Sequence, residues 1–380
     1  MDRRGFLRGC AGACVLAAVP FPAARCLAGD GLPADAHEAE YYEVLPDGRI
    51  RCQLCPNGCV RGEGERSRCR VREPRGGKYY TMAYTNPCVL AMDPIEKCPL
   101  YHFPIPGNAF SIATAGCNLN CRYCQNWQFS QKPPEETRTY RLAPAEVVAK
   151  ALEYKAGGIA FFYTEPTIYI EYLKEIAREA RKAHLATVMV TAGYIQPKPL
   201  EDLLGLIDAF TVGLKGFTEE YYRDVIGGSL QPVLETLKRL GAAKKHFEVV
   251  TLLVPTMNDQ EASIGAEVRW LAETLGPDVP LHFTRFNPQY QLKNLPPTPV
   301  STLDRARTAA LKAGLRYVYT GNVPGHEGNH TFCPSCGRLL IERLGFQTLK
   351  NSLSDGACPS CRTGIPGRWD ARPIPQGGSK

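Results

Sequence analysis

The clustering of cysteines is the feature that most constrains what this chain can fold into. Its 380 residues contain 16 cysteines, most of them in three tight groups. Spacers of two or three residues let several thiolates reach one metal ion or cluster, whereas disulfide frameworks are typical of small secreted domains. The sequence therefore predicts three metal sites, formed by Cys117, Cys121 and Cys124, by Cys333, Cys336, Cys358 and Cys361, and by Cys52, Cys55, Cys59 and Cys69.

The composition is that of a folded protein, with 44% hydrophobic and 22% charged residues. The length suits one large α/β domain with smaller additions. We find no apolar run of the roughly 18 residues needed to span a bilayer, so no membrane span is predicted. The net charge of +7 favours an acidic electron donor such as a ferredoxin or flavodoxin as a partner. No run of Lys and Arg is interleaved with aromatic residues, so we do not expect nucleic-acid binding.

The first 30 residues have the pattern of an export signal. Arg3 and Arg4, followed by Phe6 and Leu7, precede an apolar run that ends at Pro20. Paired arginines in this position resemble the twin-arginine type of signal, whose route carries folded proteins. That route suits a protein that receives its clusters in the cytoplasm. The alternative is an unprocessed basic tail on a cytoplasmic enzyme.

Residues 109–325 alternate short apolar runs with amphipathic stretches. The runs predict strands at Phe110–Ala115, Ile159–Tyr163, Ala186–Thr191, Ala209–Lys215, Phe247–Val254, Leu281–Phe286 and Tyr317–Thr320. Between them, helices are predicted at Ala145–Lys155, Ile168–Lys182, Glu220–Val225, Pro232–Leu240, Glu261–Thr274 and Thr302–Lys312. This alternation predicts an α/β fold with a partial (β/α)6-type TIM barrel, whose chemistry lies at the C-terminal ends of the strands.

Smaller segments flank the predicted barrel. Residues 31–50 are interpreted as a linker, and residues 51–108 as a Cys-rich lobe that a metal stabilises. Residues 330–369 form a four-cysteine module, and residues 370–380 a loose tail. The predicted architecture is thus a barrel with a small metal-binding lobe on either side.

The central cysteines directly follow the first predicted strand, with the spacing Cys117-x3-Cys121-x2-Cys124. Most [4Fe–4S] clusters take four thiolates, so three leave one iron without a protein ligand. S-adenosylmethionine (SAM) has an amino and a carboxylate group suited to that open iron. An electron from the reduced cluster can then break the S–C bond of SAM and release a 5′-deoxyadenosyl radical.

The string Cys121-Arg-Tyr-Cys124-Gln-Asn-Trp127 resembles radical SAM enzymes of the AmmeMemoRadiSam system, relatives of the activating enzymes of pyruvate formate-lyase. The resemblance covers nearly all of residues 51–369. It includes Asp93–Lys97 and Pro99–Phe103, upstream of the cysteine loop. It implies the radical SAM fold, a [4Fe–4S] cluster and SAM as cofactors, and radical chemistry on a substrate.

The resemblance also implies roles for single residues. Glu165 matches a glutamate that meets the amino group of SAM, and Lys215 matches a lysine that closes over SAM in the activating enzymes. His282 matches a histidine on the SAM side of those enzymes. The activating enzymes have Asp at the position of Gly213, and this departure leaves the charge balance of the pocket open.

Several residues of the predicted cofactor site have an alternative role. Glu165 could accept hydrogen bonds from an ammonium group or cap the helix that Pro166 begins. His282 could be a polar residue at the rim of the core. Thr191 and Gly193 could bring the backbone close to the SAM carboxylate or form an ordinary turn. We also assign Tyr123, the aromatic residue before the last cysteine of the loop, to the cofactor site.

The two flanking cysteine groups are interpreted as metal sites that stabilise the fold. Two Cys-x2-Cys pairs separated by 21 residues, beginning at Cys333 and Cys358, predict a closed zinc site, with rubredoxin-like iron as the alternative. The less regular group that begins at Cys52 could hold an auxiliary [4Fe–4S] cluster or a zinc ion. Cys88 and Cys98 fit no spacing and are interpreted as buried thiols.

The favoured hypothesis is a radical SAM enzyme that abstracts hydrogen from an unknown substrate. The resemblance allows either a glycyl-radical protein or an unknown partner of the AmmeMemoRadiSam system as that substrate. The second hypothesis is an iron–sulfur protein for electron transfer or redox sensing that does not cleave SAM. The third is a zinc-binding interaction module with a degenerate barrel.

Overall fold

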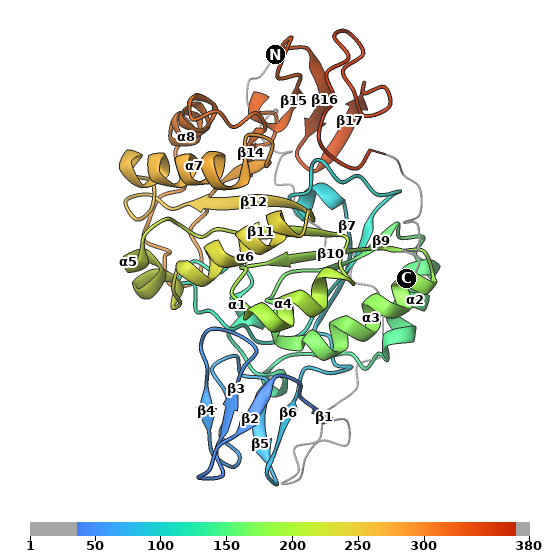
Figure 1. The fold of residues 1–380 in the computed structure, drawn as a ribbon, viewed down its shortest axis with the longest axis vertical. Coiled ribbons are helices and arrows are strands. Elements are labelled where there is room, and N and C mark those ends of the chain that lie inside the picture. Colours follow the sequence, from blue (N-terminus) through green and yellow to red (C-terminus); the bar gives the residue numbers. More distant parts are fainter. Residues whose placement is uncertain (1–35, 370–380) are drawn as a thin grey trace, which may run out of the picture.

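The computed structural model describes residues 36–369. The predicted export segment and the C-terminal tail lie outside the described residues. A barrel-like α/β body occupies the middle of the molecule, the N-terminal lobe lies at one end and the C-terminal module at the other (Figure 1). No helix in the described range is long and apolar enough to cross a membrane.

The body is built on one eight-stranded sheet whose strand order runs from β14 down to β7. Neighbours from β8 to β14 pair in parallel, whereas β7 pairs with β8 antiparallel. The strands are β7 (Val89–Asp93), β8 (Ala109–Ala113), β9 (Gly158–Phe161), β10 (Ala186–Thr191), β11 (Ala209–Gly213), β12 (His246–Leu253), β13 (Leu281–Arg285) and β14 (Val318–Gly321). The predicted partial barrel is therefore confirmed, and β7, which the sequence analysis places in the N-terminal lobe, extends its sheet.

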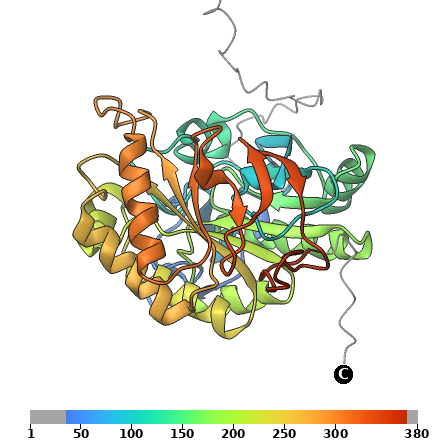
Figure 2. The same cartoon turned by 90° about the horizontal axis from the view of Figure 1, so that it is seen from above.

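Helices follow the strands and cover the outer face of the sheet (Figures 1 and 2). Their amphipathic faces bury residues such as Val147, Ile176 and Leu271 against the outward-facing strand residues. The helical segments are α1 (Trp127–Ser130), α2 (Pro144–Glu153), α3 (Ile170–Lys182), α4 (Pro197–Leu204), α5 (Glu219–Tyr221), the π-helical turn η4 (Tyr222–Ile226), α6 (Gln231–Ala242), α7 (Glu261–Leu275) and α8 (Val300–Lys312).

The segment after β7 turns into the barrel and fills its interior near the strand N-termini. It contains the short 3-10 helix η1 (Ile95–Lys97). Ile95, Leu100 and Phe103 pack against small inward-facing strand residues, namely Ala109, Ala160, Val188 and Ala209. Because those strand residues are small, the barrel can accept this plug without expanding. The plug closes the end of the barrel opposite the strand C-termini.

The N-terminal lobe consists of two three-stranded antiparallel sheets. One contains β1 (His37–Glu38), β6 (Lys78–Thr81) and β5 (Arg72–Arg75), and the other contains β2 (Tyr42–Val44), β3 (Ile50–Cys52) and β4 (Val60–Arg61). Part of the predicted linker is thus folded into this lobe. The lobe is joined to α3 by a fully buried ion pair, in which Arg72 binds both carboxylate oxygens of Glu171 at 2.6 and 2.7 Å.

The C-terminal module is a three-stranded antiparallel sheet of β15 (Thr331–Phe332), β16 (Leu339–Leu344) and β17 (Gln347–Asn351). Its core includes Leu340 and Ile341, which form one cluster with Tyr101, Tyr317 and Tyr319 of the body. Tyr317 lies next to the N-terminal end of β14, so the module covers the closed end of the barrel.

Candidate functional site

The predicted cofactor loop begins where β8 ends, and Gly116 fixes its exit. Gly116 has a φ of 92°, a conformation that favours glycine. A Cβ atom at this position would lie 2.4 Å from the carbonyl oxygen of Cys69. Glycine is therefore required here both by the backbone angle and by the close approach of the N-terminal lobe.

Backbone hydrogen bonds hold the loop from two sides. Asn120 and Arg122 donate to the carbonyl oxygens of Ile226 and Val225, at 2.9 and 3.0 Å, in η4. The carbonyl oxygen of Arg122 accepts from the amide of Gln291 at 2.9 Å. π-helical turns are rare and often occur at functional sites, and this one presents free carbonyls to the loop. The loop is therefore a fixed platform for its three thiols.

Cys117, Cys121 and Cys124 are each partly buried. Burial raises the pKa of Cys117 well above its usual range, and the charge of Glu165 raises it further. Burial also raises the pKa of Cys121 to about 12, although the nearby ammonium of Lys215 opposes that shift. Isolated thiolates are thus disfavoured here, and a bound cation would provide the charge that stabilises them.

The spacing of the thiols distinguishes a cluster from a single ion. Within residues 36–369, one group of metal-ligating side chains has all its ligand atoms within 4.8 Å of one another, and it is the C-terminal group. The three loop thiols are more widely spaced, as a cluster requires because it attaches each thiolate to a different iron. The donor set of three thiols on one loop fits a [4Fe–4S] cluster with one iron left for another ligand.

Glu165 lies just beyond the C-terminal end of β9 and is 3% exposed. It is the N-cap of the 3-10 helix η3 (Pro166–Tyr169), so the capping role considered as an alternative is present. Its Oε1 accepts three hydrogen bonds, from the Thr167 amide and hydroxyl and from the Thr191 hydroxyl. Its Oε2 accepts one, from the Ala192 amide at 2.8 Å. A carboxylate oxygen has two lone pairs, so Oε2 retains capacity for an ammonium group.

Thr191 and Gly193 form the turn that directs the Ala192 amide at Glu165. Gly193 has a φ of 67°, and its amide donates to the Thr191 hydroxyl at 3.0 Å. Its carbonyl oxygen accepts from the Thr236 hydroxyl at 2.7 Å. Both backbone groups of Gly193 are therefore used within the protein. The structure brings Thr191 to Glu165 directly, whereas Gly193 shapes the turn.

Lys215 follows β11 and is near the cysteine loop, since its charge acts on Cys121. A Cβ atom at Gly213 would lie 2.7 Å from the Lys215 Nζ. The ammonium thus folds back over the glycine, and a side chain at that position would displace it.

Aromatic residues surround the loop. Tyr123 is 5% exposed and belongs to the same core cluster as Tyr221 and Tyr222. The rings of Trp127 and Tyr290 stack with centroids 5.4 Å apart. Tyr123 is therefore placed beside the thiols by the core, and the segment after β13 covers the start of α1.

His282 has a different environment. Its Nε2 lies 2.7 Å from Glu248, and its ring contacts Tyr101 and Tyr319 near the closed end of the barrel. Burial opposes ionisation of Glu248, but hydrogen bonds with His246 and His282 hold its pKa well below the usual range. The contacts described for His282 join it to this network rather than to the cysteine loop. Its assignment to SAM stays a prediction.

A polar cluster near Glu165 was not assigned a role from the sequence. Lys97 lies 2.7 Å from Asp93 and 2.9 Å from the hydroxyl of Tyr163, which donates to the other oxygen of Asp93 at 2.7 Å. Asn126, two residues after the last loop cysteine, donates to the carbonyl oxygen of Tyr163 at 2.7 Å. The i, i+4 spacing of Asp93 and Lys97 is the signal that could have indicated the pair.

The four C-terminal cysteines meet as predicted. The Sγ atoms of Cys333 and Cys361 are 3.4 Å apart, and those of Cys336 and Cys358 are 3.7 Å apart. Tetrahedral thiolates bound at about 2.3 Å to one zinc ion lie about 3.8 Å apart. The group therefore fits a single closed four-thiolate site.

The N-terminal cysteines lie in the lobe beside the loop. Cys52, Cys55 and Cys69 are buried, and Cys59 is partly exposed. Burial raises the pKa of Cys55 to a value outside the usual range of thiols, and the charges of the other three thiols raise it further. The four side chains are therefore close enough to interact electrostatically, although they do not meet the 4.8 Å spacing of the C-terminal group.

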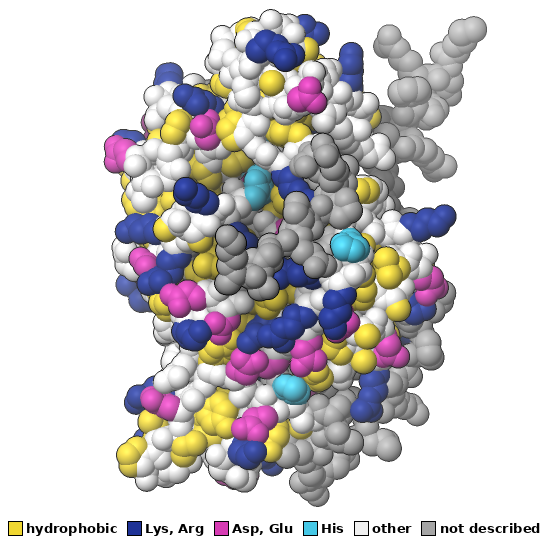
Figure 3. Space-filling view, turned by 45° about the vertical axis from the view of Figure 1, so that its right-hand side comes forward, with side chains coloured by type: hydrophobic (Ala, Val, Ile, Leu, Met, Phe, Trp, Pro, Cys, Tyr) yellow, Lys and Arg dark blue, Asp and Glu magenta, His cyan; other side chains and the backbone are white. Residues whose placement is uncertain are grey.

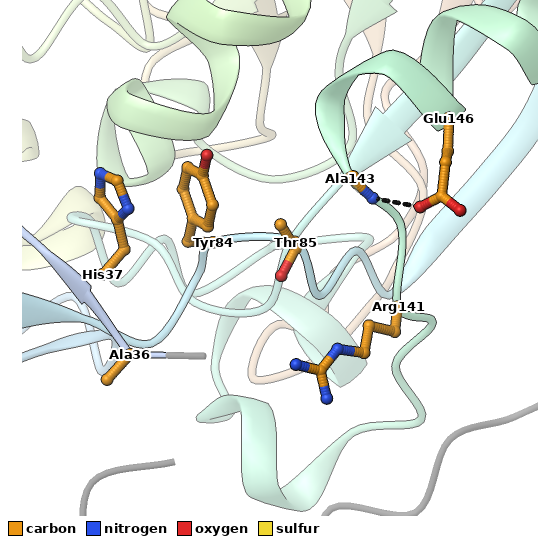
Figure 4. A pocket seen from close by; sticks show the side chains of 7 residues that line it. All are labelled: Ala36, His37, Tyr84, Thr85, Arg141, Ala143 and Glu146. Atoms are coloured by element: carbon orange, nitrogen blue, oxygen red, sulfur yellow. Dashed lines mark hydrogen bonds between the residues drawn. The ribbon is translucent and has the colours of Figure 1, made fainter. Parts of the chain in front are cut away.

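One surface pocket of about 610 Å³ lies apart from these groups (Figure 4). It is lined by Ala36, His37, Tyr84, Thr85, Arg141, Ala143 and Glu146. Glu146 accepts a hydrogen bond from the Ala143 amide and so caps α2. None of the lining residues belongs to the cysteine loop or to the strand ends that carry Glu165 and Lys215. We therefore assign this pocket no part in the site.

Comparison with known proteins shows which family has a site of this kind. The profile of the radical SAM superfamily matches residues 111–264, which contain the cysteine loop, Glu165 and Lys215. An uncharacterised protein of Methanocaldococcus jannaschii is 44% identical over 309 residues, which are 81% of this chain and 92% of that protein.

More distant relatives are activating enzymes. The benzylsuccinate synthase activating enzyme of Thauera aromatica is 29% identical over 34% of this chain and 41% of that enzyme. The pyruvate formate-lyase-activating enzyme of Streptococcus mutans is 25% identical over 42% of this chain and 64% of that enzyme. The matches thus cover less than two thirds of each activating enzyme. Profile, relatives and barrel agree, and this chain belongs to the radical SAM superfamily.

Proposed function

We propose that this protein cleaves SAM reductively and uses the resulting radical to abstract hydrogen from a protein substrate, as an activating enzyme does. The observation that carries the proposal is the juxtaposition of three thiols on one loop with the charged side chains of Glu165 and Lys215. When bound, the cluster and SAM supply one-electron cleavage of a sulfonium S–C bond to give a 5′-deoxyadenosyl radical.

The residues of the chain bind and orient the cofactors. Cys117, Cys121 and Cys124 hold the cluster, and they leave one iron for SAM. Glu165 accepts a charge-assisted hydrogen bond from the amino group of SAM through Oε2. Lys215 provides a positive charge for the carboxylate of SAM or for its ribose. The buried ring of Tyr123 fixes the loop between these groups.

The substrate proposal rests on the names of the relatives. Two activating enzymes match part of this chain, and an activating enzyme acts on another protein. The substrate class therefore follows from similarity over part of each chain, not from a contact in the structure. The uncharacterised M. jannaschii protein, which matches over 92% of its length, is the relative in which the same substrate is expected.

Three further assignments belong to this proposal. An acidic one-electron donor, such as a ferredoxin or flavodoxin, suits the net charge of +7. The C-terminal group binds zinc, with rubredoxin-like iron as the alternative. Residues 1–30 direct export by the twin-arginine route, and a reporter fused to this segment would test that assignment, since its export should fail when Arg3 and Arg4 become Lys.

A direct assay tests the central step. The protein is reconstituted anaerobically with iron and sulfide, SAM and dithionite are added, and 5′-deoxyadenosine is measured. The product should form with the parent protein and with Cys88→Ala, a control at a buried thiol outside the three groups, and should vanish in Cys121→Ala. A reducible cluster without 5′-deoxyadenosine would contradict the proposal and support the electron-transfer alternative.

A further inference from the structure

The N-terminal cysteine group lies directly against the loop that carries the SAM-site thiols. The carbonyl oxygen of Cys69 occupies the space where a side chain of Gly116 would be, and Gly116 immediately precedes Cys117. The two cysteine groups therefore meet where the backbone of Cys69 contacts that of Gly116, the residue before Cys117. No intervening element separates the lobe from the loop at this point.

Side chains between the N-terminal cysteines extend the contact. Asn57, between Cys55 and Cys59, donates to the carbonyl oxygen of Asn118 at 2.7 Å. Arg70, next to Cys69, donates to the carbonyl oxygen of Cys117 at 3.4 Å and to the side chain of Asn120 at 3.0 Å. The residues that bridge the two groups are thus next to the ligands on both sides, which gives short covalent and hydrogen-bonded connections between them.

The spacing of the four thiols indicates what they bind. In the described part of the chain, the C-terminal thiols alone form a group as compact as a single ion requires. The N-terminal thiols are spread more widely, as the SAM-site thiols are. A cubane cluster needs this wider arrangement because its four thiolates bind four different irons. No three of the N-terminal thiols lie within 4.8 Å of one another in the described residues, so the group is less compact than a single zinc ion requires, and a cubane accommodates the wider spacing.

We propose that Cys52, Cys55, Cys59 and Cys69 bind a second [4Fe–4S] cluster, which passes electrons one at a time to the cluster of the SAM site. A low-potential one-electron donor, such as flavodoxin hydroquinone, reduces the N-terminal cluster. That cluster is reoxidised when the electron moves to the SAM-site cluster, and no atom is transferred. The proposal rests on the proposed function for the role of the second cluster, but its metal site is independent of SAM cleavage.

The lobe also presents an entry point for the electron. Cys59 is the one partly exposed thiol of the four. Residues 51–70 contain five arginines and two glutamates, and three of these arginines, Arg61, Arg68 and Arg70, donate to neutral groups rather than to carboxylates, so this part of the lobe is basic. On the face drawn in Figure 3, Lys and Arg side chains are interspersed with Asp and Glu. An acidic donor would therefore be attracted to the lobe next to Cys59.

Metal content tests the site without any assay of SAM chemistry. The variant in which Cys117, Cys121 and Cys124 are all Ala should retain about four irons after anaerobic reconstitution, against about eight in the parent, because each cubane contains four. Its dithionite-reduced EPR spectrum should show a [4Fe–4S] signal that SAM does not alter. Because this variant leaves the lobe intact, zinc or no metal at the N-terminal site would overturn the proposal.

A second comparison tests the relay. In Cys69→Ser, 5′-deoxyadenosine formation driven by flavodoxin hydroquinone should fall at least tenfold, while formation driven by dithionite should change little, since that small reductant reaches the SAM-site cluster directly. Cys88→Ser is the control and should match the parent with both reductants. Equal loss with both reductants would overturn the relay role. Absence of product from the parent protein would instead contradict the proposed function and leave the iron content as the test of the site.

Discussion

At the scale of single residues, Glu165 has two tasks that a substitution can separate. Its Oε1 accepts three hydrogen bonds and caps η3, whereas its Oε2 accepts one, so Glu165→Gln keeps the size and the cap, removes the charge and turns its NH2 toward the Ala192 amide. We expect at least a tenfold weaker affinity for SAM, because a charge-assisted hydrogen bond is worth roughly 1.5–3 kcal/mol. The dissociation constant of SAM, measured by equilibrium binding to the reconstituted parent and variant, tests this expectation.

The control for this substitution is Glu179→Gln, at a glutamate paired with Lys182 on the surface of α3. Iron content and the far-UV circular dichroism spectrum should be the same in both variants and in the parent. Unchanged SAM affinity in Glu165→Gln, with iron content intact, would show that Glu165 only caps the helix.

Glu267 provides a pH dependence that is independent of the cofactors. It is buried on α7, and burial raises its pKa from about 4.5 to about 8, although the Thr251 hydroxyl that donates to it opposes the shift. The folded protein therefore binds a proton that the unfolded chain releases. As the pH rises from about 5 to about 8, this residue should therefore lower the free energy of unfolding by about 1.4 kcal/mol per pH unit.

Glu267→Gln should remove this slope, so the variant should gain stability relative to the parent as the pH rises. Urea unfolding at pH 6, 7 and 8 measures the difference. The opposite trend, or parallel curves for the two proteins, would show that Glu267 is already ionised in the fold.

At the scale of elements, the ion pair between β5 and α3 fastens the N-terminal lobe to the barrel. Arg72 and Glu171 are fully buried and bidentate, and the Glu171 carboxylate also accepts from the Glu40 amide. Breaking a buried pair leaves one uncompensated charge, which costs roughly 3–5 kcal/mol. Glu171→Leu should therefore destabilise the protein by about that amount in urea unfolding.

The double variant, Arg72→Met with Glu171→Leu, tests whether the loss of stability comes from the unpaired charge of Arg72. An apolar pair of similar volume often restores stability, because neither side chain then requires a counter-charge. We expect the double variant to be more stable than Glu171→Leu alone. A double variant that is less stable would show that Arg72 acts mainly through other partners, such as the carbonyl oxygen of Glu40.

The elements also show how far the sequence predicts this fold. The seven parallel strands are predicted within one or two residues, because most of their residues are apolar and both faces of the sheet are buried. Helix α4 was not predicted, since its sequence begins Pro-Lys-Pro, yet proline is tolerated in the first turn. The helix predicted at Glu220–Val225 is divided into α5 and the π-helical turn η4, whose last two carbonyl oxygens accept from the cysteine loop.

The candidate site is also predicted only in part from the sequence. The spacing of the cysteines is local and identifies their chemistry from the sequence alone. Contacts such as Asn57 with Asn118, or Gly116 with Cys69, join residues far apart in the chain and leave no local pattern. His282 shows the same limit, because Glu248, its partner in the structure, comes from another strand.

At the scale of the whole molecule, the two flanking cysteine groups lie at opposite ends (Figure 1). The N-terminal group touches the loop at the strand C-termini, where the chemistry of such barrels occurs. The C-terminal group lies in the module at the closed end, where Arg343 donates to the Tyr101 carbonyl oxygen at 3.0 Å. Loss of metal should therefore have different consequences at the two ends.

We expect the C-terminal metal to support folding and to leave SAM binding unaffected. The variant in which Cys336 and Cys361 are both Ser should lose one zinc per chain, or one iron if the site is rubredoxin-like, and should melt at a lower temperature, because binding energy at a closed thiolate site is folding energy. Both cysteines are exposed, so serine fits at these positions without disturbing the core. Elemental analysis, thermal unfolding and SAM binding to the reconstituted variant test this together. A variant that keeps its melting temperature but loses SAM affinity would contradict the division of roles, because the closed end of the barrel would then influence the open one.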